Sequence, residues 1–325
     1  MKKVSLGLIL LCLLFFVSVN LTLAQNYPDK AIQLVVPWTP GGSNDVLARL
    51  IGQKLLEKWK QPVVVENRPG AAGNIGATLV AKAAPDGYTL LVAAQNILAI
   101  NPTLYSNSPF DTFKDFTPIA TMGAVPVLLT VNPSVPAHSV KELVAIAKSK
   151  SEGLTYGSSG IGSPQHLTAE LFMKMAGVKM VHVAYKGAAQ TIPDLISGQI
   201  QVLCCPINSI LPHVKSGKVR ALAVAGVKRV PSLPDLPTVT EAGVKNVLSD
   251  IWISIVGPKG MAPGTVNKIN SEVAKILASD DVVKNLRMQG IEPLIHTPAD
   301  FAKLIRSDYD RWSKLIKELG IRAEQ

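Results

Sequence analysis

Short β-branched or aliphatic runs alternate along this sequence with longer amphipathic segments, and small-residue turns join them. Residues 32–36 form an apolar run typical of a buried strand, and apolar side chains then recur at helical spacing through Leu47, Ile51 and Leu55. The turn Pro85-Asp86-Gly87 precedes another apolar run at residues 88–92. Strands that alternate with helices in this way predict an α/β fold built on largely parallel sheets.

The alternation starts a second series after Thr117, with a predicted strand at residues 127–131. A chain of 325 residues is long for one core and suits two domains. Pro231, Pro234 and Pro237 exclude a helix interior or a central strand at residues 231–237, so we expect an extended surface connection there.

The first 24 residues have the pattern of a secretory signal peptide. Lys2 and Lys3 precede an apolar run at residues 6–19, and Ala24 is a small residue suited to the position before cleavage. The run is short for a membrane span, although an uncleaved anchor is the alternative. Cleavage would lower the formal net charge from +10 to about +8 and leave an exported protein, which we expect in the periplasm.

Composition argues against several classes of function. Lysines and arginines are scattered, and aromatic residues make up 5% of the chain, so we expect no nucleic acid partner. The five histidines form no short-range pair with metal-ligand spacing, and we expect neither a metal nor a cofactor. Cys204 and Cys205 are adjacent on a predicted strand, so their side chains should point to opposite faces and pack as small apolar groups.

Three glycine-rich loops each lead from a strand into a helix start, at residues 38–42, 157–163 and 185–188. The first N–H groups of a helix have no partner within the helix and carry the positive end of its dipole. Glycine lets a ligand approach that backbone closely. We expect Ser43, Asn44 or Asp45 to cap the first helix and Ser163 to cap the second, with Pro164 at its first position. The loops are candidates for binding an anion.

An enzyme is the competing class, with Ser159 as nucleophile and His166 as base. Ile161 occupies the position where a nucleophile elbow of the Gly-x-Ser-x-Gly type has glycine. The sequence therefore favours a binding protein and not an enzyme.

The chain resembles the Bug (TctC-like) family, the periplasmic solute-binding proteins of tripartite tricarboxylate transporters. The motifs that carry the resemblance are Pro40-Gly41-Gly42, Asn67-Arg68-Pro69-Gly70-Ala71-Ala72-Gly73, Pro85-Asp86-Gly87-Tyr88, Tyr156-Gly157-Ser158-Ser159-Gly160, His166-Leu167, His182-Val183-Ala184-Tyr185-Lys186-Gly187, Leu233-Pro234-Asp235-Leu236-Pro237-Thr238 and Glu241-Ala242-Gly243. They extend over nearly the whole chain after the signal peptide.

This resemblance implies a two-lobed type II periplasmic-binding-protein fold, a Venus flytrap with the ligand in the cleft between its lobes. Chain order then gives lobe one as residues 27–126 plus 226–325 and lobe two as residues 127–225. The ligand would be a small organic carboxylate, either an aliphatic di- or tricarboxylate or an aromatic acid. The ligand-binding residues carried over or expected beside them are Trp38, Thr39, Gly41, Gly42, Asp45, Ser158, Ser159, Gly162, Ser163, His166, Tyr185 and Asn208.

The resemblance also implies membrane permease subunits as partners, and we expect a monomer. A binding protein that reports to a two-component receptor is the alternative. Gln201 stands where the family commonly has aspartate, and Cys204-Cys205-Pro206 is unusual for it. Both departures concern the far end of the predicted pocket.

Overall fold

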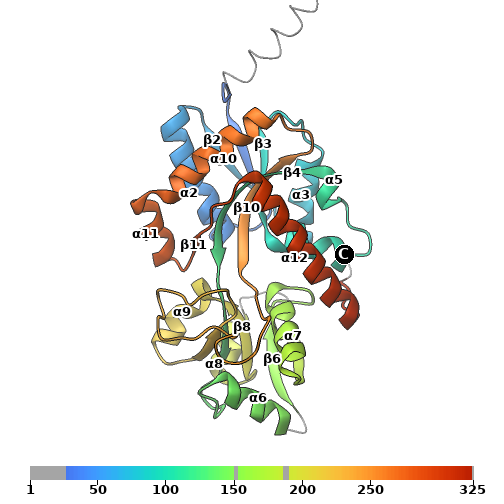
Figure 1. Ribbon diagram of the computed structural model, residues 1–325, viewed down its shortest axis with the longest axis vertical. Helices are drawn as coiled ribbons and strands as arrows, with labels where there is room; N and C mark the ends of the chain where they lie inside the picture. The colour runs from blue at the N-terminus through green and yellow to red at the C-terminus, as the bar shows by residue number, and fades with distance from the viewer. Residues whose placement is uncertain (1–26, 150–152, 186–189, 324–325) are drawn as a thin grey trace, which may run out of the picture.

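The computed structural model describes residues 27–149, 153–185 and 190–323, which form two lobes stacked along the long axis of the molecule (Figure 1). Each lobe is a β-sheet covered by helices, as the alternating sequence pattern predicts. The prediction that the sheets are largely parallel is wrong, because both are mixed and contain antiparallel pairs between segments distant in the chain. Among the described residues, no helix is both long and apolar enough to cross a membrane.

Lobe one contains the six-stranded sheet, in the order β11-β4-β10-β3-β1-β2. β1 lies parallel to β2 and β3, whereas β10 runs antiparallel to both β3 and β4. The strands are β1 (Ile32–Val36), β2 (Val63–Asn67), β3 (Thr89–Ala94), β4 (Phe116–Val125), β10 (Ile251–Pro258) and β11 (Glu292–Pro293).

Helices cover both faces of this sheet (Figure 1). On one face lie α2 (Ser43–Trp59), α10 (Pro263–Ala278) and α11 (Asp280–Met288). On the other lie α3 (Asn74–Ala81), the π-helical turn Asn96–Ile100 that leads into α4 (Asn101–Leu104), and α12 (Pro298–Leu319). The short helix α5 (Thr112–Asp115) precedes β4.

Lobe two contains the five-stranded sheet, in the order β7-β6-β8-β5-β9. Its strands are β5 (Val127–Val131), β6 (Leu154–Ser158), β7 (Met180–Ala184), β8 (Val202–Pro206) and β9 (Arg220–Val224). Its helices are α6 (Val140–Ser149), α7 (Pro164–Ala176), α8 (Thr191–Ser197) and α9 (Ile207–Lys215). The start of α7 agrees with the sequence prediction, because Ser163 is its N-cap and Pro164 its first residue.

The chain passes between the lobes where β4 gives way to β5 and again where β10 begins. Residues 226–250 precede the second crossing, and the sequence-based division counts them with lobe one. Their hydrogen bonds join them to β9 of lobe two: Val239 donates its N–H to the carbonyl of Val224, and Ser249 donates to that of Ala225. Val239 and Val247 also pack in the core of lobe two.

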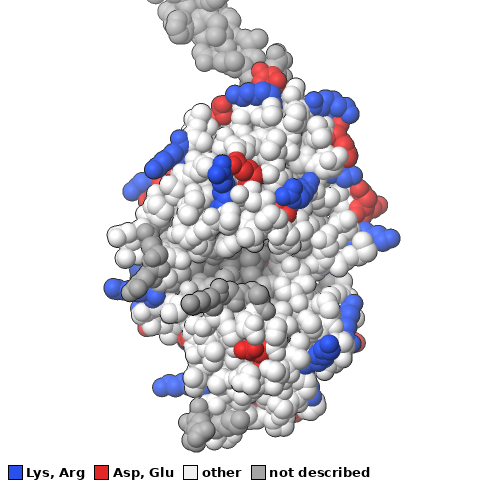
Figure 2. Space-filling view, turned by 180° about the vertical axis from the view of Figure 1, so that it is seen from behind, with Lys and Arg blue, Asp and Glu red and all other residues white. Residues whose placement is uncertain are grey.

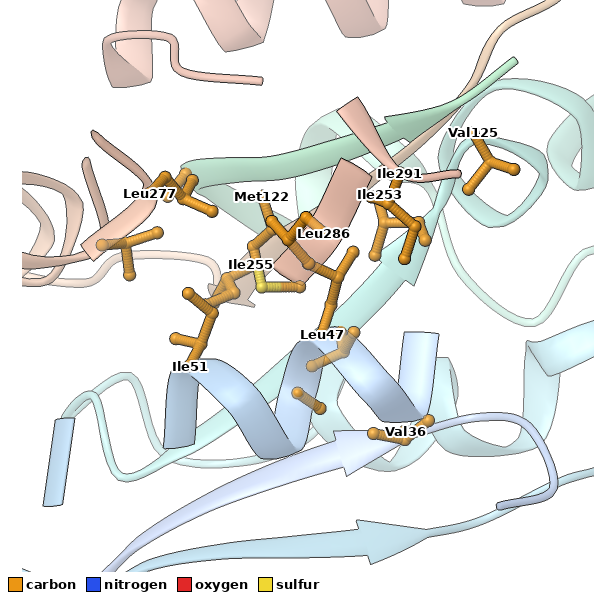
Figure 3. Packing of buried hydrophobic residues seen from close by; sticks show 14 of the residues in the cluster. Val36, Leu47, Ile51, Met122, Val125, Ile253, Ile255, Leu277, Leu286 and Ile291 are labelled. Carbon is orange, nitrogen blue, oxygen red and sulfur yellow. The ribbon is translucent and has the colours of Figure 1, made fainter. Parts of the chain in front are cut away.

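The core of lobe one fixes the position of α2. Leu47 and Ile51 on the buried face of this helix lie against Met122 of β4 and Ile255 of β10 (Figure 3). Because β1 ends immediately before the loop that leads into α2, this packing holds the start of the helix at the edge of the sheet that faces lobe two.

Candidate functional site

Two cavities adjoin where the lobes meet, with volumes of about 360 and 340 Å³. The first has walls from both lobes, whereas the second is lined by lobe two and by Ile251 at the start of β10. Pro164, Pro206, Ser209 and Ile251 belong to the walls of both, so the cavities share a boundary. The first is also lined by Trp38, Thr39, Gly42, Ser43, Asn44, Ala94, Asn96, Val125, Asn208 and Ile253, and the second by Ser159, Gln165, Thr191, Ile192 and Cys205.

The lining residues are neutral in both cavities, among the parts of the chain that the structure describes. Figure 2 shows a hollow between the lobes, and the lysines and arginines that the structure describes on that face lie away from it. An anion held by the described lining residues would depend on neutral donors and helix dipoles for its stabilisation.

The start of α2 lines the first cavity with Gly42, Ser43 and Asn44. Gly42 is the N-cap and no side chain caps the helix, so the expectation that Ser43, Asn44 or Asp45 caps it is wrong. The N–H groups of the first turn thus keep their capacity to donate to a ligand in the cavity.

Asp45 holds the loop before α2. It is 3% exposed, and its carboxylate accepts hydrogen bonds from the N–H of Gly41 at 3.0 Å, from Asn67 at 2.9 Å and from Arg49 at 2.9 Å. Burial alone would raise the pKa of Asp45, but the hydrogen bonds from Arg49, Gly41 and Asn67 lower it below its ordinary value. These contacts give Asp45 a positioning role beside the cavity walls.

A second uncapped helix start faces the first from lobe two. Pro206 is the N-cap of α9 and no side chain caps this helix either. Asn208 and Ser209 in its first turn line the first cavity. The Nδ2 of Asn208 donates to the Oγ of Ser43 at 2.7 Å, so a hydrogen bond joins the starts of α9 and α2 across the cleft.

The loop before α7 differs from the expectation that its N–H groups are unpaired. The N–H of Ser159 donates to Oε1 of Gln165 at 2.7 Å, and that of Gly162 donates to Nδ1 of His166 at 3.0 Å. The Oγ of Ser163 accepts from the N–H of His166. Within this loop, Ser159 lines a cavity, whereas Gly162 packs against Leu104 of lobe one.

His166 belongs to a buried aromatic stack below this loop. Its ring lies 4.2 Å from that of His182, which lies 4.8 Å from that of Tyr156. Burial, and then the neighbouring His182, lower the pKa of His166 to about 4, so its ring is neutral at pH 7. Since Nδ1 accepts from Gly162, the ring carries its proton on Nε2. His166 therefore fixes the loop.

The hydrolase alternative named Ser159 and His166, but Nδ1 of His166 accepts the N–H of Gly162 and its Nε2 lies 3.7 Å from Glu170. A different serine and histidine lie close together. Ser158 lies 2.6 Å from Nε2 of His182, but Ser158 is fully buried and its Oγ also donates to the carbonyl of Gly160. A nucleophile must reach its substrate, and this serine does not reach solvent. Among the described residues, no group of His, Cys, Asp and Glu has the arrangement of a metal site.

The other predicted ligand-binding residues are not among those that line the two cavities: Gly41, Asp45, Ser158, Gly162, Ser163, His166 and Tyr185. The Tyr185 hydroxyl donates to Asp194 at 2.7 Å, and burial and Asp194 raise its pKa to about 12. The loop residues 186–189 and the predicted signal peptide, residues 1–24, lie outside the described residues. Gln201 accepts from the N–H of Thr155 at 2.8 Å within lobe two.

Cys204 and Cys205 are both buried and free, and they pack in different clusters, so the prediction for the two cysteines is confirmed. Cys205 is the one that also lines the second cavity.

Of the predicted ligand-binding residues, five line the cavities: Trp38, Thr39, Gly42, Ser159 and Asn208. The sequence analysis missed Ser43, Asn44, Asn96, Gln165, Ser209, Ile251 and Ile253 as lining residues. The sequence predicts Ser43 and Asn44 as helix caps, and Gln165 immediately precedes His166, which is the predicted ligand-binding residue of that segment. Nothing in the local sequence around Ile251 and Ile253 signals that their strand borders the cleft.

The family model described as tripartite tricarboxylate transporter family receptor matches residues 47–321. Protein BugT of Bordetella pertussis is 34% identical to this chain over 298 residues, which cover 91% of each protein.

The chain is also similar in fold and sequence to solved structures. An R. palustris protein, Rpa4515, solved with adipate, has a TM-score of 0.81 and 38% identity over 91% of this chain and 99% of its own. MatC from Rhodopseudomonas palustris, solved with bound malate, has a TM-score of 0.76 and 30% identity over 89% of this chain and 100% of its own. The periplasmic binding protein BugD has a TM-score of 0.77 and 32% identity, covering 92% of this chain and 100% of its own.

Proposed function

Because this chain belongs to the family of tripartite tricarboxylate transporter receptors, which are solute-binding proteins, we propose that it captures a small organic carboxylate between its lobes for a membrane permease of that class. The observation that carries the proposal is the pair of uncapped helix starts, α2 and α9, which face the same neutral cavity. Adipate in one solved relative and malate in another support a carboxylate as the ligand.

Burying a carboxylate in a cleft costs several kcal/mol unless hydrogen bonds replace its lost water. The donors we assign to this task are the first-turn N–H groups of α2 and those of Asn208 and Ser209 in α9, assisted by the dipoles of the two helices. The N–H of Ile207 is not among them, because it donates to the carbonyl of Pro126. Backbone donors are held in place by the helices, so they need little reordering when the ligand binds.

The cavity walls favour a ligand with an apolar body. Val125, Ile251 and Ile253 contribute aliphatic surface next to the start of α2. We propose an aliphatic carboxylate ahead of an aromatic acid, because the indole of Trp38 is the one aromatic group among the described lining residues.

We place the hinge at the two crossings, near residue 126 and just before β10. Lobe one would then be residues 27–126 plus the chain from β10 onward, and lobe two residues 127–250. Closure around the ligand would create the form that the permease recognises. The proposal includes export to the periplasm, removal of residues 1–24, a monomeric state and no catalytic activity.

A thermal-shift and calorimetric comparison of carboxylates with their amides tests the proposal. At least one small aliphatic carboxylate should raise the melting temperature, and the amide of the same skeleton should bind far more weakly, because it lacks the negative charge. Equal stabilisation by acid and amide would contradict the anion site. Mass spectrometry of the purified protein should identify a bound carboxylate.

Coupling to a permease is tested separately. Uptake of the identified ligand by cells should stop when this gene is deleted and return when it is restored. Uptake that continues unchanged would contradict the transport role and leave ligand binding intact.

A further inference from the structure

We propose that Gln165 is a specificity-determining residue that binds a second acceptor group of the ligand, at the end away from α2. This inference rests on the proposed function. Gln165 is the second residue of α7, is 4% exposed and lines the second cavity.

The orientation of the Gln165 amide follows from its neighbour. Oε1 accepts the N–H of Ser159 at 2.7 Å, and since an N–H can only donate, the oxygen of the amide must be the atom on that side. The NH₂ group therefore points the other way, where its recorded partner is the sulfur of Cys205 at 3.9 Å.

A thiol is a weak hydrogen-bond acceptor, and burial raises the pKa of Cys205 to about 12, so the sulfur stays neutral. The buried NH₂ group thus retains most of its capacity to donate. A buried donor in this situation gains much by meeting a ligand oxygen, because its lost hydration is not yet replaced.

Gln165 and the start of α2 line different cavities: Gln165 belongs to the second, whereas Gly42, Ser43 and Asn44 belong to the first. The shared boundary of the two cavities is formed by Pro164, Pro206, Ser209 and Ile251, and all of these except Ser209 offer apolar side chains. A ligand that fills both cavities would place one carboxylate at α2 and α9, an apolar spacer beside Ile251, and a second acceptor at Gln165. This arrangement fits an aliphatic dicarboxylate, in which the second carboxylate is the acceptor.

The test compares straight-chain dicarboxylates, from succinate to suberate, with monocarboxylates of the same chain lengths by isothermal titration calorimetry. The variant Gln165→Glu keeps an oxygen for the N–H of Ser159 but replaces the donor with a negatively charged oxygen. Gln289→Glu makes the same change on the exposed C-cap residue of α11 and is the matched control.

Wild type should bind at least one dicarboxylate more tightly than the monocarboxylate of that length. Gln165→Glu should weaken that dicarboxylate by roughly tenfold or more, the loss expected for one hydrogen bond to a charged group. It should weaken the monocarboxylate by a smaller factor, because the α2 and α9 donors are untouched and only the repulsion from the added charge acts on a carboxylate bound there. Gln289→Glu should change neither.

Gln165→Met removes the donor without adding charge and is the second variant, for the case in which Gln165→Glu does not fold. It should also reduce the preference for the dicarboxylate. Equal losses for both ligand types, or no loss for either, would overturn the role of Gln165. Equal affinity of wild type for each matched pair would overturn the second subsite while the proposed function stands. Failure of every carboxylate to bind would overturn both.

Discussion

Replacing Asp45 with asparagine tests whether this residue positions the ligand-binding loop or contacts the ligand. In the structure its carboxylate accepts from Gly41, Asn67 and Arg49. Asparagine keeps one oxygen but turns an NH₂ group toward donors that need an acceptor. The variant therefore loses at least one hydrogen bond and the charge that strengthens the others.

The magnitude follows from the exposure of each partner. Hydrogen bonds from Gly41 and Asn67 to a buried charged group are worth about 1.5–3 kcal/mol each. The ion pair with Arg49 adds little, because 54% of that arginine side chain is exposed and solvent screens the attraction. Asp45→Asn should lower the free energy of unfolding by about 2–4 kcal/mol and the melting temperature by roughly 4–10 °C. Ligand affinity should fall as well, because the loop at residues 38–42 loses its anchor.

Calorimetry and thermal unfolding at several pH values measure these effects. Because the pKa of Asp45 is lowered in the folded state, its contribution is fully present above its ordinary pKa of 3.8 and is lost as the pH falls below that value. The difference between wild type and Asp45→Asn should shrink under those acidic conditions. Asp310→Asn, at an exposed pair, is the control and should change stability by less than about 0.5 kcal/mol. Lost binding with unchanged stability would refute the positioning role.

Three further measurements follow from the structure. Gly162→Ala should destabilise the contact between the lobes by about 1–3 kcal/mol and weaken ligand binding, because the φ of Gly162 is +75° and a Cβ there would overlap Leu104 of lobe one. The control is Gly177→Ala, at a glycine with a similar φ in open space, and it should leave binding unchanged. Burial raises the pKa of Asp250 to about 6, so the ionisation of this buried carboxyl lowers the stability of the protein as the pH rises from about 4 to 6. Asp250→Asn should therefore unfold at a higher temperature than wild type above pH 6 but not at pH 4. Equal shifts of the melting temperature at both pH values would contradict this. Cys204 and Cys205 should resist a thiol reagent at pH 8 until urea unfolds the protein, and rapid labelling of the native state would be inconsistent with their burial.

Local signals in the sequence predicted much of the fold. The strand at Ile32–Val36 and the α7 start at Ser163 and Pro164 agree with the structure, because apolar periodicity and capping chemistry act within a few residues. The two-lobed architecture came from the family resemblance. The association of residues 226–250 with lobe two was not predictable, since it depends on pairing between distant segments.

The candidate site was harder to predict for the same reason. Glycine-rich loops pointed to the helix starts, and α2 does present its first turn to a cavity. The sequence did not reveal that Gln165 and His166 use the N–H groups of Ser159 and Gly162. Competition between side chains and ligands for the same backbone donors depends on rotamers that tertiary packing selects.

A crystal structure of the protein with its ligand tests the central claim most directly. We predict a carboxylate within hydrogen-bond distance of first-turn N–H groups at both α2 and α9, with the residues around Ser43 and Asn208 closed over it. A ligand carboxylate held instead by lysine or arginine side chains, or lying outside the space between these two helix starts, would contradict the account.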